Sequence, residues 1–125
     1  MHRILIADDH IAIRQVLITI LQDEFEHLHI GEAIDTPTLI EKAFSSHWDL
    51  IISDLAMPGG GGLYALKEIK QSKPEIPVLI VSTHPQEEYE KIVLAAGAEK
   101  YINKSNLAEQ LISTIKKIVD IPSRS

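Results

Sequence analysis

The sequence has 125 residues, long enough for one domain with its own hydrophobic core. Its apolar fraction of 45% is ordinary for a globular protein, and its formal net charge of −6 argues against nucleic acid or an anionic membrane as a direct partner of this segment. The absence of cysteine excludes disulfides and thiolate metal sites, and the start Met1-His2-Arg3 leads straight into a short strand-like run, so we expect no signal peptide, no membrane span and a cytoplasmic location.

Five short apolar runs alternate with five longer stretches of helical period, which is typical of βα units around a parallel sheet. The runs predict strands at 3–8, 28–33, 49–54, 77–82 and 99–103. The intervening stretches predict helices at 11–24, 37–46, 63–71, 86–96 and 106–119. The second strand has the weakest signal, because histidines and a glycine interrupt its apolar residues. We therefore expect an α/β fold: a single doubly wound five-stranded parallel sheet flanked by five helices.

Local signals mark several helix ends. Thr36 is expected as the N-cap of the second helix, with Pro37 at its first position. Gly97 is expected to close the fourth helix, and Asn106 or Ser105 to cap the fifth. Apolar residues at helical spacing should form one face of the first helix: Ile13, Val16, Leu17, Ile20 and Leu21.

Charged and polar residues stand at the ends of four predicted strands. In an open parallel sheet, the carboxyl ends of the strands border a common crevice. Asp8, Asp9 and Asp54 should meet there, and three close carboxylates need a compensating charge, which a hard cation such as Mg²⁺ supplies. Lys104 brings an ammonium group and Ser82 a hydroxyl, both able to contact phosphate oxygens. This composition suits a divalent cation and a phosphoryl group.

A glycine-rich stretch comes soon after Asp54. Pro58 precedes four glycines at 59–62, which allow positive φ angles and close approach of the backbone to a ligand. Leu63 stands where a Walker-type loop needs lysine, so nucleotide binding is disfavoured. Histidines are not spaced as a metal cluster and are expected mostly at the surface: His2, His10, His27, His29, His47 and His84.

Each of these strand-end residues also has a simpler structural explanation. Adjacent aspartates often only supply charge or a cap at a helix N-terminus. Lys104 could be a solvated lysine, and Tyr101 an ordinary half-buried strand aromatic. Thr83 competes with Ser82 for the hydroxyl position. The coincidence of three carboxylates on adjacent strand ends favours a shared site over these separate explanations.

The combination of Asp8-Asp9-His10, Asp54-Leu55-Ala56-Met57-Pro58-Gly59, Ser82 and Lys104 resembles the receiver domain of bacterial two-component response regulators. The resemblance covers residues 2–119 and is greatest to the subfamily with a LuxR-type helix-turn-helix output domain. It implies the flavodoxin-like strand order 2-1-3-4-5, a receiver domain over 1–120, and a linker or C-terminal tail that starts at 121–125.

The resemblance also implies a role for each site residue. Asp54 would be the phosphoacceptor, and Mg²⁺ would be held by Asp8, Asp9, Asp54 and the backbone carbonyl of Ala56. The phosphoryl group would be contacted by Ser82, Lys104 and the backbone of Thr83, with Ser82 and Tyr101 forming the switch. Thr83 stands where the family more often has a smaller residue, and Trp48 where a proline often precedes the third strand.

The implied function is that of a signalling phosphoacceptor, not an enzyme with substrate turnover. A histidine kinase would be the phosphodonor, and the chain's own C-terminal output domain, outside this segment and expected to bind DNA, would be the target. Dimerisation is expected through the fourth helix, fifth strand and fifth helix, or through the first and fifth helices. Alternatives are a stand-alone receiver or phosphorelay intermediate, and a Mg²⁺-dependent phosphohydrolase with an aspartyl nucleophile, whose typical Asp-x-Asp motif is missing here.

Overall fold

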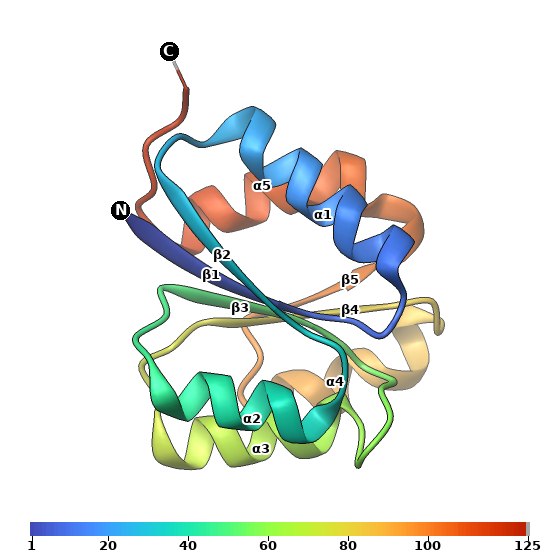
Figure 1. Ribbon diagram of the computed structural model, residues 1–125. Helices are drawn as coiled ribbons and strands as arrows, with labels where there is room; N and C mark the ends of the chain where they lie inside the picture. Colours follow the sequence, from blue (N-terminus) through green and yellow to red (C-terminus); the bar gives the residue numbers. More distant parts are fainter. Residues whose placement is uncertain (125) are drawn as a thin grey trace.

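The computed structural model describes residues 1–124 (Figure 1). Five parallel strands form one sheet in the order β2-β1-β3-β4-β5, which confirms the predicted fold and strand order. The strands are β1 (His2–Ala7), β2 (Leu28–Ala33), β3 (Leu50–Asp54), β4 (Val78–Ser82) and β5 (Lys100–Asn103).

The helices cover both faces of this sheet. α1 (Ile11–Glu24) and α5 (Leu107–Ile118) lie on one face, and α2 (Thr36–Ser45), α3 (Gly62–Ser72) and α4 (Gln86–Ala95) on the other (Figure 1). A short 3₁₀ turn, Lys104–Asn106, leads from β5 into α5. None of the helices among residues 1–124 is long and apolar enough to cross a membrane.

Two hydrophobic cores result, one on each side of the sheet. Because side chains alternate along a strand, Ile51 and Ile80 point into the core under α2, α3 and α4, while Ile52 and Leu79 point into the core under α1 and α5. Strands β3 and β4 are buried along their whole length, which explains their uninterrupted apolar sequences.

The predicted cap of α2 is wrong. Asp35 is the N-cap, and its carboxylate accepts a hydrogen bond from the Thr38 backbone N–H at 2.8 Å. Thr36 is the first helical residue, and its hydroxyl instead accepts from the Gly61 N–H at 3.0 Å. Asn106 does occupy the N-cap position of α5, but its side chain makes no capping bond.

Helix faces and the last residues also differ in detail from the expectations. Val16 was expected on the buried face of α1 but is 47% exposed. Of that face, only Leu17 and Leu21 are fully buried. Gly97, at φ +110°, lies just after α4, in the left-handed conformation typical of a helix end. Ile121 is buried, and the Arg124 N–H donates to the Glu24 carbonyl at the end of α1 (2.7 Å).

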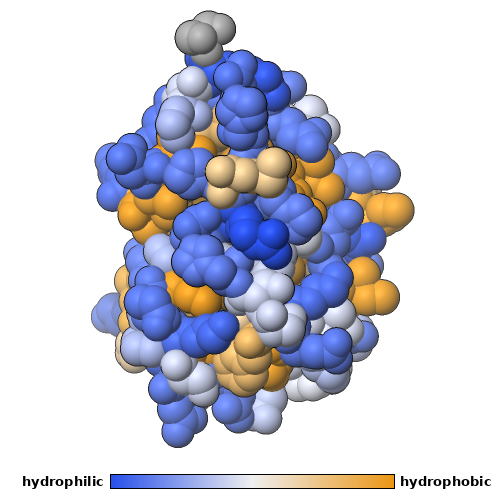
Figure 2. Space-filling view, turned by 60° about the vertical axis from the view of Figure 1, so that its left-hand side comes forward, coloured by the Kyte–Doolittle hydropathy of each residue, from blue (hydrophilic) through white to orange (hydrophobic). Residues whose placement is uncertain are grey.

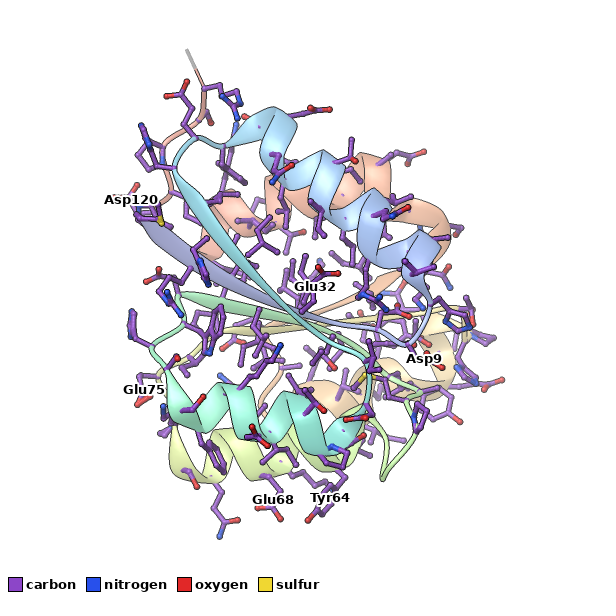
Figure 3. The ribbon with its side chains drawn as sticks, viewed as in Figure 1. Asp9, Glu32, Tyr64, Glu68, Glu75 and Asp120 are labelled. Atoms are coloured by element: carbon purple, nitrogen blue, oxygen red, sulfur yellow. The ribbon has the colours of Figure 1, made fainter. Side chains whose placement is uncertain are left out.

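The two ends of the sheet differ in chemistry. Both ends of the described chain lie where the strands begin, and Figure 2 shows this side as mainly hydrophilic, with apolar groups in small separate areas. Figure 3 shows Asp9 at the opposite end, where the strands finish, whereas Glu75 and Asp120 lie where they begin. The predicted site residues stand at the carboxyl ends of the strands.

Candidate functional site

Three strand ends bring a buried acidic pair and a lysine together. Asp8 comes directly after β1 and is fully buried, and Asp54 ends β3 and is 4% exposed. The Lys104 Nζ atom, just after β5, lies 2.8 Å from Asp8 Oδ2 and 3.3 Å from Asp54 Oδ2. Asp9 is adjacent and more accessible. Lys104 is therefore no solvated lysine: its side chain is only 8% exposed and bridges two carboxylates.

Burial dominates the electrostatics of Asp54. Loss of water around the carboxyl group raises the pKa of Asp54, and the charge of Asp8 raises it further. Lys104 and the Ala56 N–H, which donates to Asp54 Oδ1 at 3.3 Å, oppose this shift. The site therefore holds more negative charge than its own lysine compensates, which favours binding of a cation.

The adjacent aspartates Asp8 and Asp9 do not occupy the N-cap position of α1. His10 occupies the N-cap position of α1, and its side chain makes no capping bond. Asp8 Oδ1 instead accepts a hydrogen bond from the His10 backbone N–H at 2.9 Å, and Arg14 donates to the Asp8 carbonyl at 2.7 Å. These bonds orient Asp8 toward the centre of the site.

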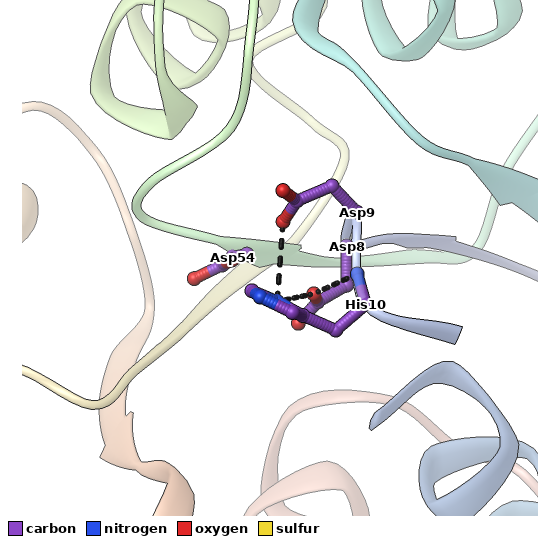
Figure 4. Close-up of side chains that lie close together, drawn as sticks. All are labelled: Asp8, Asp9, His10 and Asp54. Atoms are coloured by element: carbon purple, nitrogen blue, oxygen red, sulfur yellow. Dashed lines mark hydrogen bonds and ion pairs between the residues drawn. The ribbon is translucent and has the colours of Figure 1, made fainter. Parts of the chain in front are cut away.

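His10, a surface residue as expected, also belongs to the carboxylate cluster, which was not predicted. One potential ligand atom each from Asp8, Asp9, His10 and Asp54 lies within 4.8 Å of all the others (Figure 4). His10 Nδ1 is 3.1 Å from Asp8 Oδ1 and 3.2 Å from Asp9 Oδ1. The sequence signal was the direct succession Asp-Asp-His.

The glycine-rich loop supports the end of β3 at Asp54. Gly59, Gly60 and Gly61 have φ angles of +92°, +130° and +88°, so their expected positive φ is found. The loop backbone comes closest to Asp54 itself, because a Cβ atom on Gly62 would lie 2.0 Å from the Asp54 carbonyl oxygen. Close approach to a ligand stays a prediction. The loop thus fixes the position of the strand end.

A second hydrogen-bonded group surrounds Ser82 at the end of β4. Ser82 Oγ is buried, accepts from the His84 backbone N–H at 3.0 Å and lies 3.0 Å from His84 Nδ1. Tyr101 is 1% exposed, so the half-buried alternative is wrong, and its hydroxyl donates to the His84 carbonyl at 2.7 Å. The His84 ring meets Tyr89 of α4 edge to face, with ring centres 5.0 Å apart.

Members of both groups, among them Asp54, His10, His84 and Lys104, line one pocket of about 260 Å³. Thr83 is exposed at its rim. His84 was not among the predicted site residues, because nothing in the sequence marks it except its position two after Ser82. The pocket walls are formed by His10, Ile13, Asp54, Ala56, Thr83, His84 and Lys104.

Comparison with known proteins gives consistent matches over nearly the whole chain. The family model described as response regulator receiver domain matches residues 4–116. The chain is 36% identical over 117 residues to the oxygen regulatory protein NreC of Staphylococcus carnosus, covering 93% of this chain and 54% of that protein. It is 32% identical over 121 residues to the glycerol metabolism activator of Pseudomonas putida, covering 96% and 55%. The chain thus spans about half the length of these curated relatives.

Solved structures show the same similarity. A LuxR-family two-component response regulator from Aurantimonas superposes with a TM-score of 0.86 at 27% identity, over 93% of this chain and 83% of that one. The response regulator TrrA of Thermotoga maritima, in complex with Mg²⁺-BeF, superposes with a TM-score of 0.84 at 31% identity, over 95% of this chain and all of that chain (100%).

Proposed function

The chain belongs to the response regulator receiver domain family, and on this premise we propose that it accepts a phosphoryl group on Asp54 from a histidine kinase, in a Mg²⁺-dependent step. The observation that carries the proposal is the arrangement of Asp54: a buried carboxylate beside Asp8, with Lys104 Nζ 3.3 Å from its Oδ2, open to a pocket of about 260 Å³.

The residues present fit a divalent cation. The donor set consists of carboxylate oxygens, which Mg²⁺ prefers. Asp8 Oδ2 is buried and accepts no hydrogen bond of good geometry, although the Lys104 ammonium lies close to it. Asp8, Asp9, Asp54 and the Ala56 carbonyl would hold the ion. When bound, Mg²⁺ supplies positive charge to the carboxylates and to a phosphoryl oxygen.

The chain's own groups would do the rest. An ionised Asp54 oxygen attacks phosphorus in line, and Lys104 neutralises charge on the equatorial oxygens. Lys104 needs little movement for its role, because its ammonium already lies 3.3 Å from the acceptor carboxylate. The Thr83 backbone N–H and the Ser82 hydroxyl would contact the remaining phosphoryl oxygens.

Ser82 and Tyr101 are proposed to transmit phosphorylation to the rest of the domain. For the Ser82 hydroxyl to reach a phosphoryl oxygen, it must loosen its bond to the His84 ring (3.0 Å). Tyr101 is already inside and bonded to the His84 carbonyl, so the change at Ser82 would reach both Tyr101 and Tyr89 through His84. Phosphorylation would thus add charge at the site and shift the conformational equilibrium of the surface formed by α4 and β5.

The longer relatives suggest that a second domain lies beyond this segment. A transcriptional regulatory protein of Bacillus subtilis, YdfI, matches this chain at 31% identity over only 54% of its own length. We propose that residues 1–120 are the receiver, that 121–125 begin a linker, and that a DNA-binding output domain comes after it. Dimerisation through α4, β5 and α5 or through α1 and α5, and a cytoplasmic location, belong to the same proposal.

Phosphorylation with a small-molecule donor tests the assignment. Acetyl phosphate with Mg²⁺ should add the mass of one phosphoryl group to the intact protein, and chelation of the metal should prevent this. Asp54→Asn should abolish the addition, while Asp120→Asn, a change at an exposed aspartate at the other end of the sheet, should not. An undiminished mass increase in Asp54→Asn would refute the proposal that Asp54 is the phosphoacceptor. Continuous release of phosphate from p-nitrophenyl phosphate would favour a phosphohydrolase instead.

A further inference from the structure

We propose that His10 makes this site selective for late divalent transition metals, by adding an imidazole nitrogen to the carboxylates of Asp8 and Asp9. The inference rests on the proposed cation pocket but goes beyond it. Mg²⁺ would be held by oxygen atoms alone, whereas Co²⁺, Ni²⁺ or Zn²⁺ would also bind His10 Nδ1.

The positions of the ligand atoms support this assignment. Two ligands on adjacent corners of an octahedron, each about 2.1 Å from the ion, lie about 3.0 Å apart. His10 Nδ1 is 3.1 Å from Asp8 Oδ1 and 3.2 Å from Asp9 Oδ1. His10 Nδ1 therefore already has the separation of a neighbouring ligand from each of the two carboxylate oxygens.

The lysine does not compete for the same atoms. Lys104 Nζ approaches Asp8 at Oδ2, at 2.8 Å. His10 Nδ1 instead lies beside Oδ1 of Asp8 and Oδ1 of Asp9 (Figure 4). The two oxygens of the Asp8 carboxylate thus face different groups. A metal bound at the Oδ1 side leaves the Lys104 ion pairs in place.

Ligand chemistry then decides which ion gains from His10. Imidazole suits Zn²⁺, Cu²⁺ and Ni²⁺, while carboxylate and water suit Mg²⁺, and affinity for a mixed N/O site rises from Mn²⁺ toward Cu²⁺. A metal binds an imidazole nitrogen only when that nitrogen carries no proton. The His10 side chain is 66% exposed, so a change in its protonation does not disturb the core.

A matched pair elsewhere on the chain provides a control. His47 Nε2 lies 3.1 Å from Asp49 Oδ1 and its side chain is 76% exposed, so it is also a surface histidine paired with a carboxylate. It stands at the opposite end of the sheet, before β3. Loss of His47 removes one exposed imidazole without touching the Asp8–Asp9–His10 cluster.

Calorimetric titrations with CoCl₂ and MgCl₂ test the inference. His10→Ala and His10→Asn should weaken Co²⁺ binding at least about tenfold, the effect expected of a lost ligand, and change Mg²⁺ binding less than about twofold. His47→Ala should match the wild type for both ions. The visible absorption of bound Co²⁺ should shift in His10→Asn, and circular dichroism should confirm that the variants are folded.

Two results would overturn the inference. One is Co²⁺ affinity that is the same in wild type and His10→Ala, and the other is Mg²⁺ affinity that falls as much as Co²⁺ affinity. Failure of the proposed function is distinguishable from either result, because phosphorylation of Asp54 by acetyl phosphate is measured separately and the metal titrations do not depend on it.

Discussion

Replacement of Lys104 by methionine is the sharpest test of how the site is held together. The Lys104 ammonium is the positive partner that Asp8 Oδ2 and Asp54 Oδ2 share, at 2.8 and 3.3 Å, and all three side chains are at most 8% exposed. Methionine keeps the straight apolar stem but leaves two buried carboxylates without that charge. Removal of one partner from a buried ion pair costs about 3 to 5 kcal/mol.

Urea denaturation in metal-free buffer measures this loss. With a slope of about 2 kcal/mol per M, the midpoint at pH 7.5 should fall by roughly 2 M. Burial already raises the pKa of Asp54, and Lys104 opposes that shift, so removal of the lysine raises the pKa further. In the folded variant, the Asp54 carboxyl then keeps its proton to a higher pH than it does in the unfolded chain. The loss should therefore be largest at neutral pH and shrink toward pH 4.

Two comparisons make the test specific. Lys100→Met changes an exposed lysine of β5, the strand that ends just before Lys104, and should alter stability by less than about 0.5 kcal/mol. The double change Lys104→Met with Asp54→Asn should recover a large part of the loss, because one unpaired carboxylate is gone. Equal effects of Lys104→Met and Lys100→Met, or a loss independent of pH, would refute the account of the site as charges held by one lysine.

Three further outcomes are expected from the site and its support. Asp54→Asn should stabilise the protein in metal-free buffer at pH 7, because burial raises the pKa of Asp54 and the contribution of this one group to stability falls as pH rises from about 4. A gain that persists at pH 3 in thermal melts would contradict this. Gly62→Ala should lower the free energy of unfolding, measured by urea titration, by more than about 4 kcal/mol, because its Cβ would lie 2.0 Å from the Asp54 carbonyl oxygen. Gly61→Ala has 3.7 Å of space for its Cβ, so it should cost only the strain of its positive φ, about 1 to 2 kcal/mol. Tyr101→Phe should cost only about 1 kcal/mol by the same titration, because the backbone carbonyl that accepts its hydroxyl at 2.7 Å also accepts from Asn103 at 3.1 Å; a loss above about 3 kcal/mol would contradict this.

The sheet and the strand-end residues could be predicted because their signals are local. Buried parallel strands such as β3 and β4 need unbroken apolar runs, and the carboxyl ends of such strands share one edge. Asp8, Asp54 and Lys104 therefore had to lie near one another once the strands were located. The lysine-to-carboxylate pairing itself depends on side-chain reach, which spacing does not determine.

The predictions from sequence were wrong where two parts of the chain compete for one polar group or one surface. Thr36 has the sequence features of an N-cap, but its hydroxyl accepts a hydrogen bond from the N–H of Gly61, 25 positions away in the sequence. Asp35 caps α2 in its place. Val16 has helical spacing with Leu17 and Leu21, yet α1 buries a narrower stripe than that spacing allows. Neither outcome is visible in a short window of sequence.

One recurring turn explains why two histidines, His10 and His84, enter the site. At the ends of β1, β3 and β4, the polar side chain of the last or next residue accepts a hydrogen bond from the backbone N–H two positions later. The distances are 2.9 Å after β1, 3.3 Å after β3 and 3.0 Å after β4. The side chains are those of Asp8, Asp54 and Ser82, and the N–H groups are those of His10, Ala56 and His84.

This turn is the usual local bond of an Asp or Ser side chain to its own backbone two residues on. It folds the chain back over the strand end, so the second residue past each polar group faces the same pocket, and His10, Ala56 and His84 all line it. Two of these residues are histidines whose ring nitrogens return to the side chain that formed the turn, at 3.1 and 3.0 Å. After β5 the Ser105 N–H makes the same bond to Asn103 Oδ1 at 3.0 Å, but Ser105 is exposed and does not line the pocket. The turn therefore brings the second neighbour into the pocket only after β1, β3 and β4, and at these ends it separates His10 and His84 from the other four histidines.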